Sequence, residues 1–98
     1  MIVRIVRLTF KEDDIPAFEA LFEERKERIR SFEGCMHLEL WQDVKEPNVY
    51  CTYSHWADES YLDKYRFSEF FKETWALTKV LFKEKPQAWS VVQKAILK

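Results

Sequence analysis

Hydrophobic and polar positions change their period along this chain, and the period predicts the elements. Residues 2–10 are rich in Ile, Val, Thr and Phe and contain neither Gly nor Pro, which predicts a strand. Successive side chains of a strand point to opposite faces, so Arg4 and Arg7 fall on different faces. Neither face of this strand is therefore purely apolar.

From Asp14 to about Ser31 the apolar positions recur at helical spacing. Asp14 is a suitable N-cap, and Pro16 lies in the first turn, where its missing N–H costs nothing. Gly34 fits the left-handed position that follows a helix. Arg25 lies beside the apolar stripe, where we expect its stem to pack while the guanidinium reaches solvent. The stripe comprises Ile15, Phe18, Leu21, Phe22, Ile29 and Phe32.

Two more strands, residues 35–43 and 49–56, are predicted on either side of a hairpin turn that contains Pro47. Alternation along the first strand places four side chains on one face: Cys35, His37, Glu39 and Trp41. Along the second strand the corresponding set is Val49, Cys51, Tyr53 and His55. If the two strands pair, His37 and His55 can share a face of the sheet.

A second helical region is predicted to begin after Asp58, a good N-cap, and to continue to about Lys83. We expect a break near residues 66–68, where Ser68 can cap a second segment. Pro86 then stops the helix, because the residue before a proline disfavours helical backbone. Residues 88–96 are predicted to form the last strand.

The resulting order, β-α-β-β-α-β, is that of the ferredoxin-like fold. It predicts an α+β domain over residues 1–98, in which a four-stranded antiparallel sheet carries both helical regions on one face. The opposite face of the sheet still bears large apolar side chains, and a monomer rarely exposes such a patch. We therefore expect a homodimer in which two sheets pack face to face in a symmetric interface.

Composition narrows the functional classes. With 16 basic and 17 acidic residues the net charge is −1, which favours neither nucleic acid nor an anionic membrane as a partner. No apolar run approaches the roughly 20 residues of a spanning helix, and the N-terminal run carries charges unlike those of a signal peptide. Cys35 and Cys51 are too few for a disulfide framework or a zinc cage, so we expect both to be buried thiols in a reducing, cytoplasmic setting.

Candidate chemistry is sparse, because no phosphate-binding loop, zinc-protease motif or nucleophile elbow is present. His37 and His55 are candidates for a general base or a hydrogen-bond donor, although each can equally be a structural histidine. With Glu39 nearby, they are also a weak candidate for a metal site. The remaining signal is aromatic, and it indicates either a core or a cavity for a flat apolar ligand. The set is Tyr53, Trp56, Tyr65, Phe70, Phe71, Trp75 and Trp89.

Several short segments carry a resemblance to a known family: Phe32-Glu33-Gly34-Cys35, the hairpin positions Asp43 and Pro47, Trp56-Ala57-Asp58-Glu59-Ser60-Tyr61-Leu62, and Phe71. Through them the chain resembles, over nearly its whole length, the antibiotic biosynthesis monooxygenase family of dimeric α/β barrels. The resemblance implies small-molecule chemistry in a pocket between sheet and helices. Many members are oxygenases that use neither metal nor flavin, and their quinol or polycyclic phenol substrates react directly with O2.

The chain departs from the family pattern at its polar positions. Two histidines that typical members carry in the second helical region are replaced here by Tyr65 and Phe70, and a strand glutamate is replaced by Ser54. The haem-degrading branch has Asn, Trp and an iron-binding His where this chain has Val6, Tyr65 and Trp75. Because an indole N–H has no lone pair for iron, haem degradation is disfavoured.

The favoured function is that of a monooxygenase without a cofactor, which uses O2 on a quinol-like or polycyclic aromatic small molecule. The residues expected to act in catalysis are His37, His55 and Tyr65. The residues expected to line the substrate pocket are Tyr53, Trp56, Phe70, Phe71 and Trp75. The alternatives are a non-catalytic dimeric binding or stress-response module of the same fold, and an isomerase that uses His as a proton shuttle.

Overall fold

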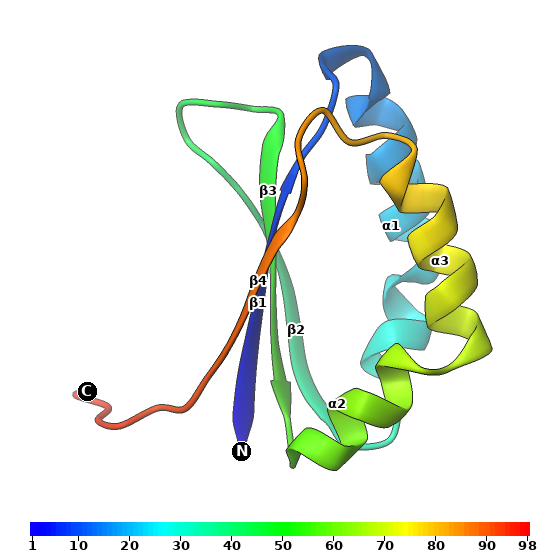
Figure 1. Cartoon of the computed structure of the whole chain (residues 1–98). Coiled ribbons are helices and arrows are strands. Elements are labelled where there is room, and N and C mark those ends of the chain that lie inside the picture. The colour runs from blue at the N-terminus through cyan, green and yellow to red at the C-terminus, as the bar shows by residue number, and fades with distance from the viewer.

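The computed structural model describes all residues 1–98 and contains the predicted order of elements (Figure 1). In chain order these are β1 (Ile2–Thr9), the 3-10 helix η1 (Glu12–Asp14), α1 (Ile15–Arg30), β2 (Cys35–Gln42), β3 (Val49–Trp56), α2 (Glu59–Arg66), α3 (Glu69–Lys79) and β4 (Gln87–Val91). None of the helices combines the length and the apolar character that crossing a bilayer requires.

The four strands form one sheet in the order β2-β3-β1-β4, and every neighbouring pair is antiparallel. Figure 1 shows α1, α2 and α3 on one side of this sheet, while its other face carries no helix. This confirms the ferredoxin-like α+β fold. The two faces are called the helix face and the outer face below.

Two of the three predicted helix caps are formed. The Asp58 carboxylate accepts a hydrogen bond from the backbone N–H of Ser60, and the Ser68 hydroxyl accepts one from Phe71, which separates α3 from α2 at the expected break. The side-chain cap expected from Asp14 is absent. Asp14 belongs to η1 and lacks the extended backbone of a cap, so its carboxylate forms an ion pair with Lys11 instead.

A bulge changes the faces predicted for β2. The register of β2 on β3 shifts between Cys35 and His37, so that Cys35 lies opposite Trp56 while His37 lies opposite His55. Cys35 is buried with Trp56 and Leu62 under the helices. The prediction that Cys35 shares a face with His37 is therefore wrong, because the extra residue of the bulge reverses the alternation.

The last strand is shorter than the predicted residues 88–96. β4 ends at Val91, which pairs with Val3, and β1 itself begins at Ile2. Residues beyond this point have no neighbouring strand with which to form hydrogen bonds, so the pairing ends although the sequence continues to favour strand. In Figure 1 the C-terminal segment leaves the sheet on the side away from the helices.

The buried side chains under the helices fall into two groups. One contains Leu8, Phe10, Phe18 and Tyr50, and the other contains Cys35, Trp56 and Leu62. Tyr50 and Trp56 are six residues apart on β3, so the two groups lie toward opposite ends of the sheet. The helix face between them is where the cavity described next is found.

Candidate functional site

A cavity of about 410 Å³ lies between the helix face of the sheet and the helices. Twenty residues line it, and 13 of them are hydrophobic. This volume lies within the range of small-molecule sites, and a lining of this kind suits a flat apolar ligand. The cavity agrees with the position that the family resemblance implies.

The sheet contributes the floor of the cavity through alternate residues of its strands. Arg4, Val6 and Leu8 of β1 line it, as do Thr52, Ser54 and Trp56 of β3. Arg4 lies opposite Ser54 on one side and Ser90 on the other. Val6 lies opposite Thr52 and Ala88 in the next row. The floor therefore has a polar row that contains one arginine, followed by a largely apolar row.

The helices contribute an aromatic wall. The ring of Tyr65 in α2 stacks on Trp56 with 5.1 Å between centroids, and it makes a T-shaped contact with Phe71 at 5.0 Å. Phe71 in turn lies almost parallel to Trp75, at 5.9 Å and 10°. Four aromatic side chains that were predicted from the sequence as site residues thus form one continuous lining, from β3 through α2 to α3.

Tyr65 supplies a hydroxyl to this lining. Burial raises the pKa of Tyr65, and the nearby Cys35 thiol adds to this effect, so the phenol is neutral at physiological pH. The hydroxyl makes no hydrogen bond with another protein group, and it is not sealed from solvent. The hydroxyl is therefore available for a hydrogen bond with water or with a ligand.

The other polar groups around the cavity are mostly engaged. Trp56 Nε1 donates to the Ser54 hydroxyl at 3.0 Å, and the Thr78 hydroxyl donates to the carbonyl oxygen of Thr74 at 2.7 Å. Arg25, which was expected to reach solvent from beside the apolar stripe, donates instead to the Thr74 hydroxyl at 2.8 Å and forms an ion pair with Glu73. These bonds hold the lining in place and leave few donors for a ligand.

Two arginines in the lining were not singled out from the sequence. Arg4 reaches the cavity from β1, and Arg66 reaches it from the last turn of α2. Arg4 Nη1 donates to the Ser90 hydroxyl at 3.0 Å. Alternation placed Arg4 on one face with Val6 and Leu8, but it did not indicate that the helices cover this face.

His37 and His55 lie on the outer face, away from this cavity. They share this face, as expected if β2 and β3 pair, and they lie opposite one another with ring centroids 5.0 Å apart. His37 Nε2 is hydrogen-bonded to Glu39, and His55 Nε2 to the Tyr53 hydroxyl at 2.7 Å. Burial and the neighbouring His37 lower the pKa of His55. Their expected role in catalysis stays a prediction.

The outer-face cluster is completed by Trp41, whose ring stacks on Tyr53 at 4.6 Å and whose Nε1 donates to Glu39 at 2.7 Å. Hydrogen bonds from His37 and Trp41 lower the pKa of Glu39. No three His, Cys, Asp or Glu side chains in the chain are placed to hold one metal ion. The cluster is thus a hydrogen-bonded aromatic surface.

Two predicted pocket residues are separated from the cavity. Tyr53 faces the outer side with the histidines, because it alternates with Thr52 and Ser54 along β3. Phe70 is buried against Phe32 at 5.7 Å, with the Arg28 guanidinium 4.1 Å above its ring. Phe70 therefore fills the contact between α1 and α3 and does not line the cavity.

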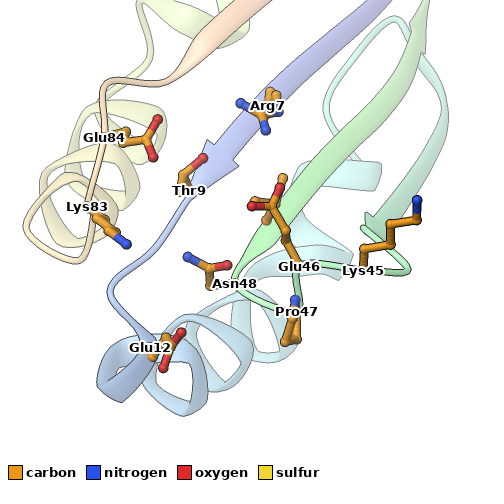
Figure 2. Close-up of a pocket in the computed structure, with 10 residues that line it drawn as sticks. Arg7, Thr9, Glu12, Lys45, Glu46, Pro47, Asn48, Lys83 and Glu84 are labelled. Atoms are coloured by element: carbon orange, nitrogen blue, oxygen red, sulfur yellow. The ribbon is translucent and has the colours of Figure 1, made fainter.

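A second, polar hollow of about 260 Å³ lies where β1 ends, beside the β2–β3 hairpin and the segment between α3 and β4 (Figure 2). It is lined by three basic and three acidic side chains: Arg7, Lys45, Lys83, Glu12, Glu46 and Glu84. No ion pair joins any of them. Its balanced charge and nearly complete lack of apolar lining make it unsuitable for an aromatic ligand.

Comparison with known proteins agrees with this geometry. The family model described as antibiotic biosynthesis monooxygenase matches residues 1–77. No curated protein matches the chain. A crystal structure of an antibiotic biosynthesis monooxygenase is similar to it at a TM-score of 0.90 and 21% identity, over 97% of this chain and 100% of that one.

Two further structures are comparably similar. A conserved protein from Methanosarcina mazei Go1 has a TM-score of 0.89 and 23% identity, over 96% of this chain and 94% of that one. A protein from Mycobacterium tuberculosis has a TM-score of 0.88 and 16% identity, over 99% and 98% of the two chains. At these identities the structural similarity establishes the fold.

Proposed function

Because this chain belongs to the antibiotic biosynthesis monooxygenase family, we propose that it oxidises a quinol-like or polycyclic aromatic molecule with O2 in the cavity under the helices. The observation that carries this proposal is the aromatic wall of Trp56, Tyr65, Phe71 and Trp75 around a space of about 410 Å³. Flat rings stack on such walls and lose their hydration there.

In this reaction the substrate supplies the electrons. Its ionised, electron-rich ring reduces O2, one oxygen atom becomes bonded to a ring carbon, and the other leaves as water with two hydrogen atoms of the substrate. No electron donor besides the substrate is required for this balance. The protein's part is to exclude water, to orient the ring and to favour its ionised form. Tyr65, as a neutral phenol with a free hydroxyl, suits a hydrogen bond to the substrate oxygen.

O2 uptake by metal-stripped protein, with a panel of reduced naphthoquinols and anthrones, tests this proposal. The expected result is uptake above the autoxidation rate measured without protein. Ala88→Trp would fill the cavity from β4 and should abolish the excess uptake, because Ala88 is a small residue of the lining. Uptake at the background rate with every substrate would count against an oxygenase.

A His37→Ala, His55→Ala double variant decides where the reaction occurs. Catalysis in the cavity predicts that this variant keeps its activity, because both rings lie on the outer face. Loss of activity in the double variant, with Ala88→Trp unaffected, would assign the reaction to the outer face, where the structure places these two candidate bases.

A binding module without turnover is the second candidate function. The observation that favours it is the absence of any imidazole, thiol or carboxylate from the cavity lining, so that no strong general base faces a ligand there. It predicts saturable quenching of Trp fluorescence by an aromatic ligand under O2, with the ligand recovered unchanged.

A homodimer through the outer face is part of the proposal. Trp41 and Trp89 remain 41% and 46% exposed on this face, and Val91 lies beside Trp89 on β4. Packing two such faces together would bury these side chains around a symmetry axis. Cys35 and Cys51 are both free thiols, which suits the reducing conditions of the cytoplasm; Cys35 is buried as expected, whereas Cys51 is only half-buried.

A further inference from the structure

Two guanidinium groups border the same apolar cavity. Arg4 projects from β1 on the helix face, and Arg66 ends α2, so they approach the cavity from the sheet and from the helices. They are near enough that the charge of Arg66 lowers the pKa of Arg4, in addition to the larger effect of burial. The protein thus holds two like charges beside an apolar space.

Neither arginine is neutralised by a carboxylate partner. No ion pair involves Arg4 or Arg66, and Asp and Glu are absent from the cavity lining. The side chain of Arg4 makes one hydrogen bond, to the Ser90 hydroxyl. Asp63 does act on Arg4 through space, but its influence is smaller than that of Arg66.

This arrangement has a physical consequence. A guanidinium does not lose its proton under physiological conditions, so the repulsion and the partial desolvation are not relieved by titration. An anion placed between the two groups would relieve both. A planar ionised oxygen group matches the guanidinium fork, and such charge-assisted bonds are stronger than bonds between neutral groups.

We infer that the ligand of this cavity is an aromatic anion, whose ionised oxygen group binds between Arg4 and Arg66 while its rings lie against Phe71 and Trp75. This inference rests on the proposed function, because it assumes that the cavity accepts an aromatic molecule. It specifies that the molecule is negatively charged and which side chains select it. An aromatic carboxylate and a phenolate both have the ionised oxygen group that this inference requires.

Matched naphthalene ligands test the charge. Binding of 2-naphthoate and of the neutral 2-naphthamide is measured by calorimetry and by quenching of Trp fluorescence. Since the two probes have nearly the same shape, they differ mainly in charge. We expect the carboxylate to bind about tenfold more tightly or better. Equal affinity of the two probes would overturn the inference and leave the proposed aromatic site intact. Binding of neither probe would count against both the inference and the aromatic site.

Variants test the two arginines. Arg66→Gln, at the exposed end of α2, and Arg4→Gln should each remove most of the preference for the carboxylate while changing naphthamide affinity little. Arg7→Gln is the control, because Arg7 lies on the same strand but borders the polar hollow on the other face. Thermal unfolding checks that each variant is folded. An undiminished preference in Arg66→Gln and in a folded Arg4→Gln would overturn the assignment.

A chromophoric phenol tests the phenolate arm. 4-Nitrophenol changes its visible absorption when it ionises, so its pKa is read directly in the presence of the protein. Two nearby guanidinium groups should lower that pKa on binding. A lowered pKa in wild type and in Arg7→Gln, lost in Arg66→Gln, supports the inference. A pKa that is raised on binding would contradict it, because burial without a cationic partner has that effect.

Discussion

Gly34 and Tyr61 approach so closely that a Cβ atom at position 34 would lie 2.3 Å from Cγ of the tyrosine. Gly34 also has a φ of +85°, in the left-handed region. Two independent constraints, backbone conformation and space, thus require glycine where α1 turns into β2. The contact ties the start of β2 to the start of α2.

We predict that Gly34→Ala lowers the free energy of unfolding by about 2–4 kcal/mol, which combines the cost of left-handed backbone with that of overpacking. Urea unfolding followed by circular dichroism measures it. Glu33→Ala is the control, since the neighbouring side chain is exposed and should change stability by less than about 0.5 kcal/mol. An equal effect of the two variants would show that Tyr61 moves aside freely.

The raised pKa of Tyr50 predicts that the protein loses stability in alkali. Burial, followed by the hydrogen bond to Glu19, raises its pKa from 10.0 to about 12. The unfolded chain therefore loses this proton first as pH rises, so the contribution of Tyr50 is fully present below about pH 10 and is lost toward pH 12. Urea unfolding at a series of pH values should show this decline, and Tyr50→Phe should flatten it.

At neutral pH the same Tyr50→Phe variant should lose about 1 kcal/mol of stability. Its hydroxyl donates to Glu19 at 2.7 Å and accepts from Gln42 at 3.1 Å. Both partners are exposed residues that can bond to water instead. A loss of several kcal/mol at neutral pH would indicate that the hydroxyl also maintains packing in the core.

Ser54 holds the indole of Trp56 at the floor of the cavity. Both residues are buried, and the serine hydroxyl is the acceptor for Trp56 Nε1. We predict that Ser54→Ala costs about 1–3 kcal/mol, because the indole N–H then lacks a partner. Ser90→Ala is the matched control, since that exposed serine bonds only to Arg4 and should cost less than about 0.5 kcal/mol.

The dimer proposal predicts a mass of twice 12.0 kDa by light scattering at micromolar concentration. Trp89→Glu should shift that mass toward one chain, because it places a charge among the apolar side chains of the outer face. Val44→Glu, at a hairpin position that is 97% exposed, should leave the mass unchanged. A monomeric wild-type protein would refute the dimer.

Local chemistry in the sequence determined much of this fold. Alternation and helical period predicted the strands and the α-helices, but not the short 3-10 helix η1, since those periods follow from backbone geometry alone. Gly34 and the caps at Asp58 and Ser68 were also recognisable, because each acts within a few residues of itself. The shared face of His37 and His55 followed from the hairpin between their strands, whereas their direct pairing is seen only in the structure.

Tertiary structure decided the rest. Alternation separates the two faces of a strand but does not say which face the helices cover. Only the folded chain therefore shows that Arg4 lies on the helix face and Tyr53 on the outer face. The bulge that turns Cys35 inward depends on its packing with Trp56 and Leu62. β4 ends at Val91 because its antiparallel partner β1 begins there, and a strand is stable only as far as its hydrogen-bonding neighbour extends.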